Sequence, residues 1–127
     1  MRKQIEVLVL DDESIVCERL KDYFGKKEIA VETYTDPVKA LQRLKTKTFD
    51  VIVTDIKMQG PSGIDVLVNV KQEGYRSEVI IITGYGSFET YREAEFVGAY
   101  DFISKPFEMS KLHNLVIKAA KKARKHT

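Results

Sequence analysis

The sequence predicts an α/β fold in which a parallel sheet of five strands is covered by helices on both faces. Two observations support this prediction: short runs rich in valine and isoleucine recur along the 127 residues, and segments with helical apolar periodicity separate them. Near-continuous apolar runs are typical of strands that are buried on both faces. The alternation of strand and helix implies right-handed crossovers between parallel neighbours.

Each strand is expected where an apolar run is too short to form a helix. The five runs are 5–10, 31–34, 51–53, 79–82 and 100–103. Between them, apolar residues repeat at helical spacing. These are Val16, Leu20 and Phe24, then Val38, Leu41 and Leu44, then Ile64, Leu67 and Val68, then Phe88, Tyr91 and Ala94, and finally Leu112, Leu115, Val116, Ala119 and Ala120. Asp36-Pro37 resembles a helix N-cap followed by proline at the first helical position, and Ser87 is a second N-cap candidate.

Composition places the chain among ordinary globular domains. Its length fits one domain, and a hydrophobic content of 43% is enough for a core. The single cysteine, Cys17, rules out an intramolecular disulfide and suits a reducing cytosol. No run approaches the roughly 18 apolar residues of a membrane helix. The net charge is only +2, and we expect the basic C-terminus to be a solvated helix face. Its residues are Lys118, Lys121, Lys122, Arg124 and Lys125.

Polar side chains follow four of the five expected strands. Asp11-Asp12-Glu13 come after the first strand, Thr54-Asp55 after the third, Thr83-Gly84 after the fourth, and Ser104-Lys105 after the fifth. Ligands of open parallel sheets bind beyond the carboxyl ends of the strands. These acids, the hydroxyl and the lysine are therefore expected to converge on one edge. Any one of them alone would be interpreted as a helix cap, a turn residue or a solvated charge.

Carboxylates that share a crevice repel one another, by about 3 kcal/mol for a pair about 5 Å apart at an effective dielectric constant near 20. A hard cation such as Mg²⁺, which binds carboxylate and phosphate oxygens, can offset this repulsion. An aspartate beside such a cation can attack a phosphoryl group, while a lysine stabilises the transferring oxygens. The residues by themselves thus predict metal-assisted phosphoryl chemistry or anion binding.

The whole chain resembles the receiver domains of two-component response regulators. The motifs are residues 8–13, then Asp55-Ile56-Lys57-Met58 with Gly63, then residues 82–86, and finally residues 98–107 with Lys105-Pro106-Phe107. They occur in family order, one at each relevant strand end. The resemblance implies the flavodoxin-like (βα)5 fold with strand order 2-1-3-4-5, so that residues 1–127 form one receiver domain. The segment from Thr83 resembles receivers of the nitrogen-regulation activator type, so the last helix is interpreted as the start of a severed linker or the end of a stand-alone receiver.

The resemblance also implies residue roles. Asp55 would be the phosphoacceptor, with Mg²⁺ held by Asp12, Asp55, the main-chain carbonyl of Lys57 and, through water, Asp11. Thr83 and Lys105 would contact the phosphoryl group, and Thr83 and Phe102 would form the switch. Lys57 and Tyr85 would modulate dephosphorylation, and the bond to Pro106 would be cis. We expect the Lys105 ammonium to sit near water, so that its removal changes stability little.

The function implied is a cytoplasmic, phosphorylation-activated signalling switch rather than an enzyme acting on other substrates. A histidine kinase would donate the phosphoryl group. The face made by the fourth helix, fifth strand and last helix would control an output domain or partner, and could form a homodimer. We expect no membrane contact and no direct nucleic acid binding. Two departures from the family pattern are Gln59, where proline is usual, and Phe102, which lacks the hydroxyl of the common tyrosine.

Two other functions are compatible with parts of the sequence. A phosphatase of the haloacid-dehalogenase type also uses an aspartate nucleophile, but its pattern is Asp-x-Asp after the first strand, and Ser14 would stand where little could act as the acid. A DNA-binding module could use the basic C-terminus, although no helix-turn-helix follows it.

The receiver interpretation also predicts how long the phosphorylated state lasts. Bulky Tyr85 and non-acidic Lys57 predict comparatively slow self-dephosphorylation.

Overall fold

The computed structural model describes residues 3–56, 62–84 and 88–125. Five parallel strands form one sheet in the order β2-β1-β3-β4-β5, which confirms the predicted fold class and strand order. The strands are β1 (Glu6–Leu10), β2 (Ala30–Tyr34), β3 (Val51–Asp55), β4 (Glu78–Thr83) and β5 (Asp101–Ser104). Each starts within one residue of the expected run, and β3 continues two residues further, to Asp55.

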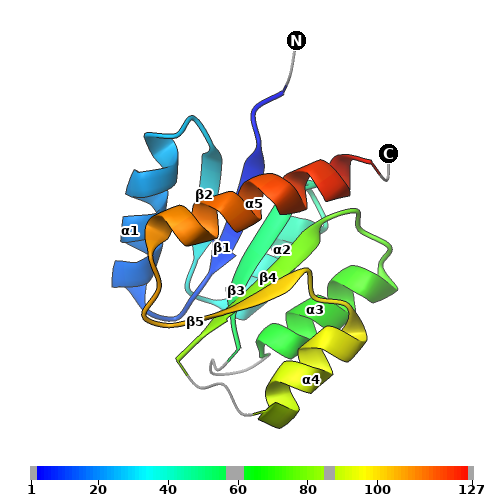
Figure 1. The fold of residues 1–127 in the computed structure, drawn as a ribbon. Helices are drawn as coiled ribbons and strands as arrows, with labels where there is room; N and C mark the ends of the chain where they lie inside the picture. Colours follow the sequence, from blue (N-terminus) through cyan, green and yellow to red (C-terminus); the bar gives the residue numbers. More distant parts are fainter. Residues whose placement is uncertain (1–2, 57–61, 85–87, 126–127) are drawn as a thin grey trace.

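Helices cover both faces of this sheet (Figure 1). They are α1 (Ser14–Gly25), α2 (Pro37–Leu44), α3 (Gly63–Gln72), α4 (Phe88–Val97) and α5 (Met109–Arg124). Helices α1 and α5 lie on one face, and α2, α3 and α4 lie on the other. The two-residue period of a strand sends alternate side chains to opposite faces. Val7 and Val9 therefore pack in the core under α1 and α5, while Leu8 and Leu10 pack under α2 and α3.

Local capping explains where two helices begin. The Asp36 carboxylate accepts a hydrogen bond from the Val38 amide at 2.9 Å, and Pro37 occupies the first helical position, as the sequence predicts. Ser62 and Asp65 form a capping box at the start of α3, because each side chain accepts a hydrogen bond from the other's amide. The predicted N-cap Ser87 lies outside the described residues.

The parallel register brings the carboxyl ends of four strands level with one another. Leu10 pairs with Thr54, Asp55 with Ile82, and Thr83 with Ser104. Residues that directly follow β1 and β5 are thereby placed beside the ends of β3 and β4. Because these strands are paired in register, and β1, β3 and β4 are buried, the backbone at the edge that carries the polar side chains is held in place.

Candidate functional site

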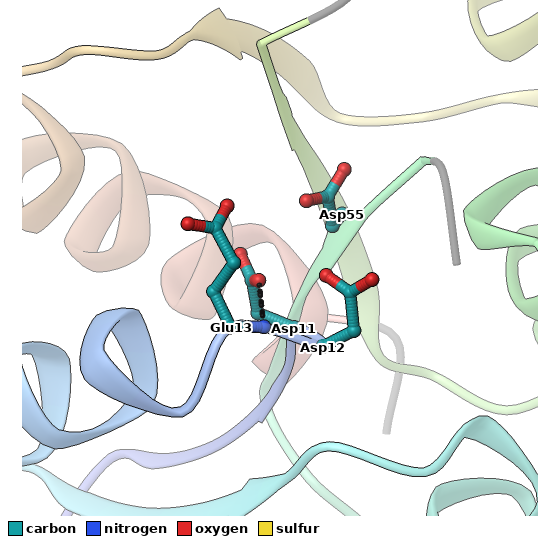
Figure 2. Close-up of side chains that lie close together, drawn as sticks. All are labelled: Asp11, Asp12, Glu13 and Asp55. Carbon is teal, nitrogen blue, oxygen red and sulfur yellow. Dashed lines mark hydrogen bonds between the residues drawn. The ribbon is translucent and has the colours of Figure 1, made fainter. Parts of the chain in front are cut away.

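Four acidic side chains meet at the carboxyl edge of the sheet (Figure 2). Asp11, Asp12 and Glu13 follow β1, and Asp55 ends β3. One carboxylate oxygen from each lies within 4.8 Å of the others. Asp11 and Asp55 are buried, at 0% and 6% exposure, whereas Asp12 and Glu13 are exposed. The predicted convergence of acids on one edge is therefore present in the structure.

Lys105 reaches into this group from the end of β5. Its Nζ donates hydrogen bonds to Asp55 Oδ2 at 2.8 Å and Glu13 Oε1 at 3.0 Å, and lies 2.8 Å from Asp11 Oδ2. Burial by itself lowers the pKa of the ammonium, but the close contacts with these three acids outweigh burial, so the pKa lies above its ordinary value. Only 16% of the side chain is exposed. The ammonium was expected near water, and the side chain does keep this partial exposure, but three acids hold it at the site.

The cost of burying the Asp11 carboxylate is only partly offset by its neighbours. Burial raises the pKa of its carboxyl, and the contacts with Lys105 and the Glu13 amide offset only part of that rise. Its Oδ1 accepts a hydrogen bond from the Glu13 amide at 2.8 Å. Its buried Oδ2 faces Lys105 but accepts no well-oriented hydrogen bond from the described residues. A buried carboxylate oxygen with a single ammonium as its partner among the described residues, beside two further carboxylates, fits a hard divalent cation with oxygen ligands.

Gly63 shapes the site from the start of α3, although the sequence analysis assigned it no role beyond the family motif. A Cβ atom at this position would overlap the carbonyl oxygen of Asp55. The Gly63 amide also donates to the carbonyl oxygen of Ile56 at 3.0 Å. Only glycine lets α3 begin this close to the end of β3. The signal available in the sequence was its place a few residues after the acidic strand end.

Thr83 lies beside the acidic group at the end of β4, and Phe102 lies on the neighbouring strand β5. Thr83 ends β4 and is 1% exposed, and its carbonyl accepts a hydrogen bond from the Lys105 amide at 2.8 Å. The Phe102 ring is partly buried on β5 and its centroid is 4.5 Å from that of Tyr91 on α4. The two rings help to line a groove of about 60 Å³ between α4 and β5. Tyr91 was predicted only as part of the apolar stripe of α4, yet it is 41% exposed.

The other predicted site features are three residues and the bond between Lys105 and Pro106. Lys57, Tyr85 and the departure at Gln59 lie outside the described residues. The Lys105–Pro106 peptide bond is cis. Beside it, a second groove runs between α1 and the loop after β5, next to Lys105. It is lined by Glu13, Val16, Arg19, Lys105, Pro106, Phe107 and Met109.

The basic end of α5 is only partly a solvated face. The Arg124 guanidinium donates to both carboxylate oxygens of Asp50 at 3.1 Å, and to the carbonyl oxygens of Lys3 and Gln4. Arg76 donates to the same carboxylate at 2.7 Å. This cluster lies at the amino edge of the sheet, opposite the acidic site. For Arg124 the prediction of a solvated charge was therefore wrong, because Asp50 is 2% exposed and needs cationic partners.

Comparison with known proteins gives consistent results. A sequence model of the family described as "Response regulator receiver domain" matches residues 7–117. The response regulator protein PilR of Pseudomonas aeruginosa is 31% identical over 114 residues, covering 90% of this chain and 26% of PilR. A putative NtrX-like response regulator of Rickettsia conorii is 35% identical over 91% of this chain and 25% of its own length. The chain thus spans about a quarter of these relatives.

Solved structures agree with this match. The beryllofluoride-activated NtrC4 receiver domain dimer aligns with a TM-score of 0.87 and 30% identity, covering 93% of this chain and 98% of that one. The crystal structure of FixJ-N aligns with a TM-score of 0.86 and 29% identity, covering 94% and 96% of the two chains. No helix in the described ranges is both long and apolar enough to cross a membrane.

Proposed function

Since this chain belongs to the response regulator receiver domain family, we propose that residues 1–127 form one receiver domain that is phosphorylated on Asp55 by a histidine kinase. Receivers of this family are phosphorylation-dependent signalling switches. The observation that carries the assignment to Asp55 is its position. It ends a buried central strand, beside two further aspartates and within 2.8 Å of a lysine ammonium.

The reaction follows from the groups around Asp55. One carboxylate oxygen of Asp55 forms a bond to phosphorus while the phosphorus–nitrogen bond of the phosphohistidine breaks, and its electron pair stays on the imidazole nitrogen. Lys105 offers its compact charge to the phosphoryl oxygens as they move. The groove lined by Glu13, Lys105 and Phe107 lies beside the site and is the proposed place where a donor side chain approaches.

The same residues account for the Mg²⁺ requirement of the proposal. Asp11, Asp12 and Asp55 would hold the ion, with the main-chain carbonyl of Lys57 as the further ligand that the family resemblance implies. When bound, the ion neutralises the carboxylates and the incoming phosphoryl charge. The buried Asp11 Oδ2, which lacks a well-oriented hydrogen bond among the described residues, is the feature that best fits a cation here.

Transmission of the signal is proposed to involve α4, β5 and α5. A phosphoryl group on Asp55 adds charge and acceptor oxygens, which would draw the Thr83 hydroxyl towards the site and let Phe102 move behind it. An output domain or partner, or a second copy of the chain, would bind this face. The match covers about a quarter of PilR, which supports an output domain as a partner. The NtrC4 receiver domain dimer supports a second copy of the chain. The chain would act in the cytoplasm and catalyse only its own phosphorylation and dephosphorylation, with Lys57 and Tyr85 slowing the latter.

The decisive experiment is labelling with acetyl phosphate, with and without Mg²⁺. The parent is expected to gain one phosphoryl group only when Mg²⁺ is present. Asp55→Asn should gain none, whereas Asp22→Asn, which changes an exposed acid on α1, should behave like the parent. Steady phosphate release from a phosphomonoester would instead support a phosphatase.

Binding of the ion can be tested separately from the chemistry. Titration with Mg²⁺ is expected to show much weaker binding to Asp12→Ala than to the parent, because the substitution removes a ligand and a charge together. Asp22→Ala is the matched control for the loss of one negative charge. Equal affinities of Asp12→Ala and Asp22→Ala would remove Asp12 from the site.

A further inference from the structure

Glu13 differs from the other two acids that contact Lys105. All three carboxylates lie within 3.0 Å of the ammonium nitrogen. The Asp11 and Asp55 side chains are buried, however, while the Glu13 side chain is 58% exposed. The two aspartates belong to the proposed metal site. Glu13 is thus a partner of Lys105 that projects into solvent at the rim of that site.

The backbone directs Glu13 towards Lys105 rather than towards its own helix. Glu13 is the N-cap residue of α1, but its side chain makes no capping hydrogen bond to the described helix. Its amide is instead held by Asp11 Oδ1 at 2.8 Å. In Figure 2 the side chains of Glu13 and Asp12 stand on opposite sides of Asp11. A tethered backbone therefore presents the Glu13 carboxylate at one side of the acidic group.

A cation among the aspartates would change what holds Lys105. It would take up most of the negative charge of Asp11, Asp12 and Asp55, and would repel the ammonium. Among the described contacts of Lys105, Glu13 is the acid outside the proposed set of Mg²⁺ ligands, so it would keep its charge in that state.

We propose that Glu13 is a positioning residue that keeps the Lys105 ammonium beside Asp55 while Mg²⁺ occupies the aspartates. This inference rests on the proposed function. Glu13 touches neither the phosphoryl group nor the ion in this role, and it acts only through Lys105. The ammonium is then already in place when the phosphoryl group arrives, which limits the reorganisation that the transfer requires.

The test follows the ¹⁵N signal of the Lys105 side-chain ammonium, which is visible by NMR only while the group is held and exchanges slowly with water. In the parent and in the control Glu18→Gln, which changes an exposed acid of α1, the signal is expected with and without Mg²⁺. In Glu13→Gln it should persist without Mg²⁺, because two aspartates still hold Lys105, and disappear at saturating Mg²⁺.

A kinetic arm measures phosphorylation by phosphoramidate at saturating Mg²⁺. Glu13→Gln should lower the maximal rate about two- to fivefold, the range of an exposed ion pair, and should have no effect in a Lys105→Ala background. An ammonium signal that survives Mg²⁺ in Glu13→Gln, or an equal rate loss in both backgrounds, overturns the proposal. So does a loss of Mg²⁺ affinity as large as that of Asp12→Ala, because Glu13 would then be a ligand. Failure of the parent to bind Mg²⁺ or accept a phosphoryl group would instead refute the proposed function.

Discussion

At the scale of single residues, charge balance at the acidic site depends on one cation among the described side chains. Lys105 Nζ contacts Asp11, Glu13 and Asp55, and Asp11 is fully buried. Burying a carboxylate without a compensating partner costs free energy. Removing one partner of a buried ion pair therefore leaves the desolvation of the other without compensation. In the absence of a metal ion, Lys105 therefore serves the fold as well as the proposed chemistry.

This dual role gives a prediction for Lys105→Ala. Without Mg²⁺ the variant should lose about 1–3 kcal/mol of unfolding free energy in urea denaturation, because Asp11 and Asp55 face each other without the ammonium. Saturating Mg²⁺ should recover part of the loss, since the ion replaces the missing charge. The control is Lys118→Ala, which removes an exposed lysine of α5. A Lys105→Ala variant as stable as this control without Mg²⁺ would contradict the charge-balance argument.

At the scale of elements, α5 is held to the sheet differently at its two ends. Leu112 and Val116 pack in the apolar core. The last residue of the helix, Arg124, makes an ionic contact with Asp50 just before β3. Burial by itself raises the pKa of Asp50, but hydrogen bonds from Arg124, the Glu6 amide and Arg76 outweigh burial, so the pKa lies below its ordinary value. The end of α5 is therefore fixed by charge.

Arg124→Ala is expected to lower the unfolding free energy by about 1–3 kcal/mol at neutral pH. Because the folded pKa of Asp50 is depressed, its ion pairs stabilise the fold fully above the unfolded pKa of about 3.9 and lose that contribution as the pH falls through the folded value. The difference between parent and variant should therefore shrink below about pH 4. Lys121→Ala, an exposed change on the same helix, is the control. A difference that stays constant down to pH 3 would show that Asp50 is not the partner that matters.

At the scale of the whole molecule, the acidic site and the α4–β5 groove are linked through adjacent strands. Thr83 ends β4 beside Asp55, and Phe102 on β5 pairs in register with Ile81. The Phe102 ring in turn contacts Tyr91 on α4. Thr83, Phe102 and Tyr91 thus lie on adjacent elements between Asp55 and the outer surface of α4, an arrangement that fits the route proposed for the switch.

Thr83→Ala tests this route. The variant should still accept a phosphoryl group on Asp55, because the carboxylates and Lys105 are unchanged. It should transmit the change poorly, since the hydroxyl that would be drawn towards the phosphoryl oxygens is missing. The measurement is the NMR shift of the amides of residues 88–107 on phosphorylation, compared between parent and variant. Shifts of equal size would exclude Thr83 as the link.

The sequence by itself determined the elements and the edge at which the chemistry lies. Apolar runs and helical stripes are local patterns, and they specify strands and helices because each period matches one backbone geometry. The parallel alternation then brings the residues after each strand to one edge. For this reason the sequence alone predicts that five side chains lie together, namely Asp11, Asp12, Asp55, Thr83 and Lys105.

Only the tertiary structure decided which charges pair. Lys105 and Glu13 are 92 positions apart, and Arg124 and Asp50 are 74 apart. Sequence patterns place Lys105 and the acids at one edge and indicate a solvated charge at Arg124, but they do not specify which side chains pair. Their burial and partners depend on how helices and loops settle on the sheet. The energy of an ion pair varies with separation and local dielectric, and neither is encoded in local sequence.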